Sequence, residues 1–167
     1  MTHKTYLTMA AIGNAGKTTA ARYVVRPGSG GTLLTLESHS STGEEGQAIA
    51  GDALAAHLFA PAMGGTVIDI GVGDTLAALE ALRLVGRQDP NLPARLCIIV
   101  PMLADAKSVA GLRWLIGQMP ETLRPAIRVL WNRIPVDADE SLRASDVYRG
   151  QGTRAPAQIP ALRTGIV

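Results

Sequence analysis

The chain has 167 residues, enough for one domain with a substantial hydrophobic core. Its hydrophobic fraction of 47% excludes an intrinsically disordered protein, and its single cysteine excludes an internal disulfide framework. The net charge is only +2, no apolar run approaches membrane-spanning length, and the first residues lack a signal-peptide pattern. We therefore expect a cytoplasmic protein without a membrane segment.

Short apolar runs alternate with helical patterns, which predicts an α/β fold with a mostly parallel sheet flanked by helices. Strands are expected at 5–11, 32–36, 66–70, 95–100 and 127–131. Helices are expected at 17–25, in an Ala-rich segment ending near 59, at 75–85 and at 104–119. The apolar side of the helix at 75–85 is expected to hold Leu76, Leu79 and Leu82, with Val85. Residues 26–31, with one proline and three glycines, are expected to form a loop. We expect residues 1–167 to be a single domain that becomes irregular from about 146.

The strongest motif is Ala-Ile-Gly-Asn-Ala-Gly-Lys-Thr-Thr at 11–19, between the first strand and the first helix. Glycines let a backbone wrap around a phosphate chain, and N–H groups at a helix N-terminus form an anion nest. Lys17 would supply a positive charge to the β- and γ-phosphates, and the Thr18 hydroxyl could coordinate Mg²⁺. Ala11 occupies the first glycine position of G-x-x-x-x-G-K-[ST], and the alternative is an ordinary strand–turn–helix with a capping loop. The placement between strand and helix favours nucleotide binding.

Acidic residues end two of the expected strands. Asp69 lies at the carboxyl end of 66–70, where a carboxylate could hold Mg²⁺ directly or through water, although such a residue can also be a cap or a turn former. Gly71 and Gly73 would let the following loop approach the γ-phosphate. Glu37 ends the second strand and could orient water or contact Mg²⁺, or it could be a solvated loop residue. Asp74 is a similar but weaker candidate.

Asn132 follows the last expected strand. Its amide offers a donor and an acceptor, which suits an adenine edge, while the alternative is a turn residue. The pair Asn-Arg differs from the Asn-Lys-x-Asp pattern of guanine sites, which favours ATP over GTP. Cys97 lies in an apolar run, so we expect a buried structural thiol, and Trp114 is expected to serve packing.

Taken together, these segments resemble the ParA/MinD-like ATPases, the plasmid-partition and cell-division branch of the P-loop proteins. The matching segments are Gly-Asn-Ala-Gly-Lys-Thr-Thr at 13–19, Val-Ile-Asp-Ile-Gly at 67–71, Cys-Ile-Ile-Val-Pro at 97–101 and Val-Leu-Trp-Asn-Arg at 129–133. The Asp-Ile-Gly sequence is most similar to the StbB/TraL group, which is linked to stability and conjugation of plasmids. The resemblance covers about residues 4–135.

The resemblance implies a P-loop NTPase architecture that binds ATP or ADP with Mg²⁺. Nucleotide contacts are implied at Gly13, Asn14, Ala15, Gly16, Lys17, Thr18, Thr19 and Asn132. Metal binding is implied at Thr18 and Asp69. Catalytic roles are expected for Lys17, Glu37 and Asp69. Two positions depart from the family: Ile12 stands where a lysine would reach the other subunit's nucleotide, and Thr35 with Glu37 stands where an acidic pair is expected.

The function expected from this resemblance is a slowly hydrolysing ATPase that acts as a switch in plasmid stability, partition or conjugative transfer. Its expected partners are a nucleotide-dependent second copy of the chain and a plasmid stability or conjugation protein, and dispersed arginines make DNA contact conceivable. One alternative is a small-molecule kinase that uses residues 143–154 as an arginine-bearing lid. Another is a non-hydrolysing adaptor, which the departures at Ile12 and Glu37 would suit.

Overall fold

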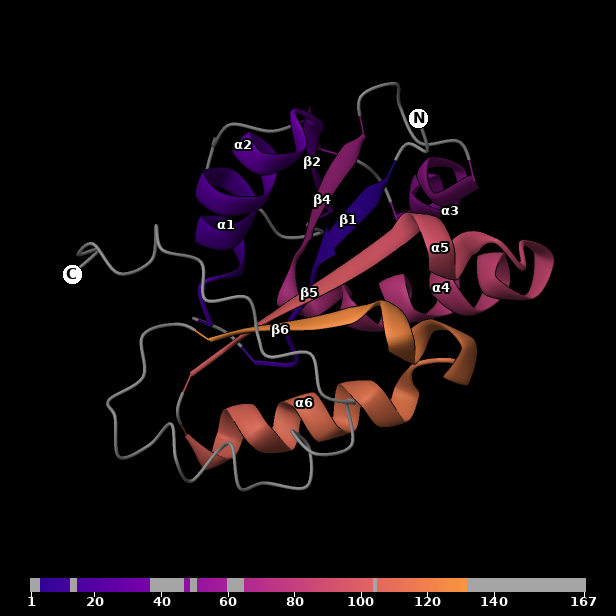
Figure 1. Ribbon diagram of the computed structural model, residues 1–167. Coiled ribbons are helices and arrows are strands. Elements are labelled where there is room, and N and C mark those ends of the chain that lie inside the picture. The colour runs from indigo at the N-terminus through magenta and orange to yellow at the C-terminus, as the bar shows by residue number, and fades with distance from the viewer. Residues whose placement is uncertain are drawn as a thin grey trace.

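The computed structural model describes residues 4–12, 15–36, 47–48, 51–59, 65–103 and 105–131. Six parallel strands form the centre of this part of the chain (Figure 1). The strands are β1 (Thr5–Thr8), β2 (Thr32–Leu36), β3 (Gln47–Ala48), β4 (Thr66–Ile70), β5 (Leu96–Met102) and β6 (Ile127–Trp131). The α-helices are α1 (Lys17–Ala20), α2 (Arg26–Ser29), α3 (Gly51–Phe59), α4 (Thr75–Gln88), α5 (Leu92–Arg95) and α6 (Ala106–Gln118). A π-helical turn, η1 (Ala21–Val25), and two 3-10 turns, η2 (Val72–Asp74) and η3 (Glu121–Ala126), complete the described elements.

The strand order is β3-β2-β4-β1-β5-β6, and every neighbouring pair is parallel. This arrangement confirms the expected α/β fold with a parallel sheet flanked by helices. The strand β1 lies at the centre, and its last residue Thr8 pairs in register with Asp69 of β4 and with Ile99 of β5. The expected strands at 32–36, 66–70 and 127–131 are observed with the same bounds, whereas β1 ends three residues early and β5 continues through Pro101.

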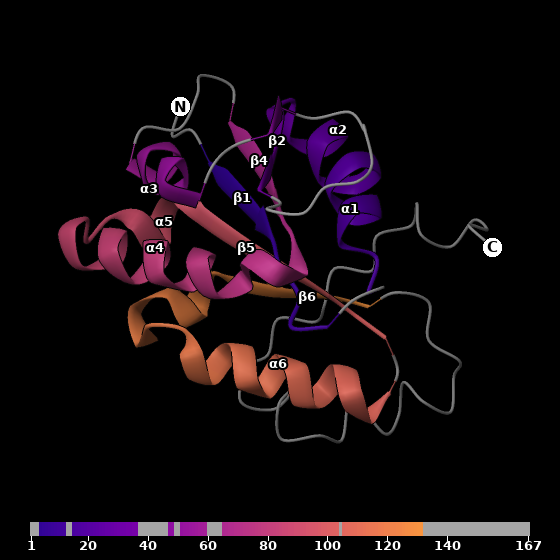
Figure 2. The same ribbon diagram turned by 180° about the vertical axis from the view of Figure 1, so that it is seen from behind.

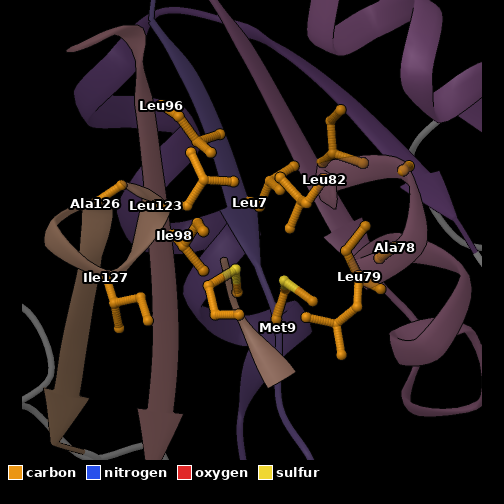
Figure 3. Packing of buried hydrophobic residues seen from close by; sticks show 14 of the residues in the cluster. Leu7, Met9, Ala78, Leu79, Leu82, Leu96, Ile98, Leu123, Ala126 and Ile127 are labelled. Carbon is orange, nitrogen blue, oxygen red and sulfur yellow. The ribbon is translucent and has the colours of Figure 1, made fainter. Parts of the chain in front are cut away.

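The helices cover opposite faces of the sheet (Figures 1 and 2). The continuous helical segment α1-η1-α2 packs on one face, where Ala21 and Val25 contact Leu33 and Val67. The other face carries α3, α4, α6 and η3, whose apolar side chains form the main core with the opposite side of the strands. Figure 3 shows this core, in which Leu79 and Leu82 of α4 point toward Leu7 and Met9.

Two expectations about the helices were wrong. Leu76 is 59% exposed, because the buried stripe of α4 is centred near Leu82 and the helical repeat turns Leu76 away from the sheet. Residues 26–29 continue the helix after the π-helical turn η1, in which the Arg26 N–H bonds the Ala21 carbonyl, and Pro27 lies at this junction. The segment ends at Gly30, whose φ of 65° suits glycine. Among the described helices, none has the length and apolar character needed to cross a bilayer.

Candidate functional site

The candidate site lies at the carboxyl ends of β1 and β4. The segment after β1 (α1) and the helix after β4 (α4) pack on opposite faces of the sheet, although the two strands are neighbours. Helices that diverge in this way leave a crevice at the strand ends, which is the place where open parallel α/β sheets bind ligands. The topology therefore brings the loop after β1 and the turn after β4 to a common location.

The start of α1 has a backbone conformation that favours glycine. Gly16 caps the helix with φ 85° and ψ 25°, a left-handed conformation that favours glycine. Its carbonyl accepts the first helical bond from the Ala20 N–H at 2.9 Å. Ala15 is buried, while Lys17, Thr18 and Thr19 are half-buried in the first turn. These three side chains are thus positioned at the N-terminal end of a helical segment that continues to Ser29.

Asp69 connects this helix start to the sheet. Its side chain is only 4% exposed, and each carboxylate oxygen accepts one threonine hydroxyl. The Thr8 hydroxyl donates to Oδ1 and the Thr18 hydroxyl donates to Oδ2, both at 2.6 Å. Such short bonds to a buried carboxylate are charge-assisted, and they offset part of the cost of taking the carboxylate out of water. The structure therefore brings together Thr18 and Asp69, the two residues expected to bind metal.

The turn after β4 is held to both neighbouring segments. The Gly71 N–H donates to the Leu36 carbonyl at the end of β2, at 2.7 Å. The buried Thr75 hydroxyl donates to the Ala10 carbonyl at 3.1 Å and approaches the Gly71 carbonyl at 3.5 Å. Asp74 is buried at the start of α4. Because Ala10 precedes the phosphate-loop motif directly, the turn after Asp69 and that loop share a hydrogen-bonded link.

The loop after β1 also packs against α6. A Cβ atom placed on Gly111 of α6 would lie 3.1 Å from the Ala11 Cβ and 3.4 Å from the Ile12 Cγ2. The side chains of Ala11 and Ile12 therefore pack against α6 at the position where Gly111 has no side chain. The contact gives a physical reason for glycine at position 111, and it places Ile12 against α6.

The donor set of Thr18 and Asp69 suits a magnesium ion, because both side chains offer oxygen atoms. No cluster of three or more His, Cys, Asp or Glu side chains occurs in the described ranges. Magnesium is commonly held by one or two carboxylates together with phosphate oxygens and several waters. Thr18 and Asp69 would hold Mg²⁺ here, and the bound ion would neutralise charge on a phosphate group.

Four expected site residues lie outside the described residues, namely Gly13, Asn14, Glu37 and Asn132. The same holds for the lid segment 143–154 and for the irregular segment from 146. Sequence reasoning missed Thr8 and Thr75, both fully or almost fully buried. A threonine within an apolar strand gave the only available signal for Thr8, since its pairing with Asp69 depends on strand register.

Two further expectations concern residues outside the site. Cys97 is half-buried, and burial raises the pKa of its thiol, which accords with an unreactive structural thiol. Trp114, for which packing was expected, is 40% exposed.

Comparison of the sequence with known protein families and with functionally characterised proteins finds no match.

Proposed function

We propose that this protein binds ATP with Mg²⁺ at the loop between β1 and α1, as a P-loop protein of the ParA/MinD-like class. Lys17 would bind the terminal phosphates, with backbone N–H groups from Gly13 to Gly16 around the phosphate chain. Thr18 and Asp69 would hold the metal, and Asn132 would contact adenine. Glu37 remains the candidate for orienting water.

A single observation carries this proposal, the 2.6 Å hydrogen bond from the Thr18 hydroxyl to Asp69 Oδ2. The two residues are 51 positions apart in the sequence, and Asp69 was assigned to metal because its strand follows the phosphate-loop motif that contains Thr18. A chance likeness to a phosphate loop would not require an aspartate of the neighbouring strand beside the threonine that follows Lys17. A sheet in which β1 and β4 are adjacent provides that arrangement.

Within this proposal, the protein is a slow, partner-regulated switch in plasmid stability, partition or conjugative transfer. Nucleotide occupancy would change the turn after Asp69, which is linked to the loop through Thr75 and Ala10. That turn would then alter binding of a plasmid stability or conjugation protein, of DNA or of a second copy of the chain. Cytoplasmic location belongs to the same proposal.

The packing of Ile12 favours the adaptor as the second candidate function. The resemblance implies a lysine at this position that reaches the nucleotide of another subunit. Ile12 instead lies beside Gly111 of α6 and carries no charge. Hydrolysis triggered by a second copy of the chain is therefore not part of the proposal, and a nucleotide-binding adaptor would retain ATP without turnover.

The test is a titration with a fluorescent ATP analogue, with and without Mg²⁺, using the wild type and Lys17→Ala. Lys107→Ala is the matched control, because Lys107 is exposed on α6 and belongs to no part of the site. We expect saturable, Mg²⁺-sensitive binding that Lys17→Ala loses and Lys107→Ala retains. Absence of binding by the wild type would refute the proposal. Phosphate release from ATP then separates a switch from an adaptor, and phosphate transfer to a metabolite without release indicates a kinase.

A further inference from the structure

We infer that Thr8 is a positioning residue that makes the metal site selective for Mg²⁺ over Ca²⁺. This inference rests on the proposed function, because it concerns the cation bound with the nucleotide. Its basis is the unequal character of the two hydrogen bonds that Asp69 accepts.

The bond from Thr8 is built into the sheet. Thr8 and Asp69 are partners in the parallel register of β1 and β4, and their side chains project from the same face of the sheet. Thr8 is 0% exposed, so its hydroxyl has no access to solvent as an alternative partner. Rotation of this hydroxyl away from Oδ1 would leave a buried donor without a partner, at a cost of about 1–3 kcal/mol. Oδ1 is therefore committed to Thr8 while the sheet is intact.

The bond from Thr18 is different because its donor lies on the first turn of α1 and is half-buried. This bond is only partly buried, and its hydroxyl oxygen keeps lone pairs that can face a cation. Asp69 Oδ2 and the Thr18 hydroxyl are consequently the atoms that can serve a metal. Oδ1, whose bond to Thr8 is buried and persistent, is the poorer ligand of the two oxygens.

A carboxylate that offers one oxygen more readily than the other discriminates between the two cations. Calcium takes six to eight oxygen ligands and readily accepts both oxygens of one carboxylate, whereas magnesium has six ligands, keeps several waters and needs only one oxygen from each carboxylate. The buried hydrogen bond from Thr8 draws electron density from Oδ1 and makes it a weaker second ligand, which disfavours the bidentate mode that would benefit calcium. It also fixes the orientation of Asp69, and loss of such an outer partner commonly lowers metal affinity about 10–100-fold.

The test measures the affinity for the fluorescent ATP analogue without metal, with Mg²⁺ and with Ca²⁺, in the wild type, Thr8→Val and Thr8→Ser. For Thr8→Val we expect unchanged affinity without metal, a gain from Mg²⁺ reduced about tenfold or more, and a gain from Ca²⁺ that is unchanged or larger. Thr8→Ser keeps the hydroxyl and should keep the preference of the wild type. A thermal unfolding curve for each variant tests whether that variant is folded.

The chain supplies a matched control in Thr5→Val. Thr5 lies on the same strand and is also 0% exposed, yet among the described residues its hydroxyl has no hydrogen-bond partner. Thr5→Val should therefore keep the cation preference. The inference is overturned if Thr8→Val keeps the wild-type ratio of Mg²⁺ to Ca²⁺ gains, or if Thr8→Ser loses it equally. Absence of nucleotide binding by the wild type with either cation overturns the proposed function and this inference together, whereas the other two outcomes leave the proposed function intact.

Discussion

Replacement of Asp69 separates its structural role from its role toward metal. In the absence of ligand, Asp69→Ala removes both hydrogen bonds and leaves the buried Thr8 hydroxyl without its acceptor. A hydrogen bond to a charged group contributes about 1.5–3 kcal/mol, and the two contributions are partly offset because the variant no longer buries a carboxylate. We therefore expect Asp69→Ala to lower the free energy of unfolding by about 2–4 kcal/mol.

Asp69→Asn should behave differently because an amide can serve both threonines. Its oxygen accepts from one hydroxyl, and its NH₂ group donates to the other, since a threonine hydroxyl can act as donor or acceptor. The loss of stability should stay within about 1 kcal/mol of the wild type. The enhancement of nucleotide binding by Mg²⁺ should nevertheless disappear, because the amide carries no negative charge.

Urea unfolding followed by tryptophan fluorescence, without nucleotide or metal, measures both free energies. Equal unfolding midpoints for Asp69→Ala and the wild type would show that the two hydroxyls do not depend on this carboxylate. Equal destabilisation by Asn and Ala would show that the negative charge, and not the pair of hydrogen bonds, stabilises the fold.

Two further predictions concern parts of the fold around the site. The hydrogen bond from Arg95, at 2.6 Å, holds the pKa of Asp89 below its ordinary 3.8. The stabilisation by Asp89 is thus complete above pH 3.8 and is lost as the pH falls through the lower pKa of the folded state. The difference in urea midpoint between the wild type and Asp89→Asn should be constant from neutral pH down to this region and shrink below it. On α6, a methyl group at position 117 would meet open space, so Gly117→Ala should raise the free energy of unfolding by about 0.5–1 kcal/mol and leave binding of the ATP analogue unchanged. Gly111→Ala should weaken that binding. Equal effects of the two substitutions on binding would contradict this prediction.

Much of the sheet was predictable because each strand carries its own signal. Residues 32–36, 66–70 and 127–131 are short apolar runs rich in β-branched side chains or leucine, and their bounds agree with the structure. The association of Thr18 with Asp69 was expected because the motif that contains Thr18 follows one parallel strand and Asp69 lies at the carboxyl end of another. Local sequence was sufficient to predict those features that depend on one segment alone, such as the bounds of these strands.

The remaining features depend on contacts between distant segments. The role of Thr8 follows from the register of β1 against β4, which is fixed by packing of both faces and not by either strand alone. The exposure of Leu76 depends on which side of α4 meets the sheet. The helical turn at 26–29 forms despite its proline and glycine because it continues the helical segment of α1 and η1, and tertiary context can outweigh local helix propensity.

The alanine at the first motif position and the glycine on α6 form a complementary pair. A phosphate loop with glycine at that position leaves room for a side chain on the neighbouring helix, whereas here the Ala11 methyl group occupies the space above Gly111. In Gly111→Ala the two methyl carbons would lie 3.1 Å apart, so the loop or the helix must move by a few tenths of an ångström. Displacement of the backbone N–H groups would weaken phosphate binding, because an anion nest depends on their convergence.

The double variant Ala11→Gly with Gly111→Ala removes this overlap and exchanges the two small residues. We expect it to recover most of the affinity for the ATP analogue that Gly111→Ala loses, with a coupling energy of about 0.5–3 kcal/mol between the two sites. Ala11→Gly alone should leave binding close to the wild type. A double variant that binds no better than Gly111→Ala would mean that α6 affects the site by another route. Recovery would show instead that alanine at position 11 is an accommodation to α6, so that its departure from the motif carries no argument against a functional phosphate loop.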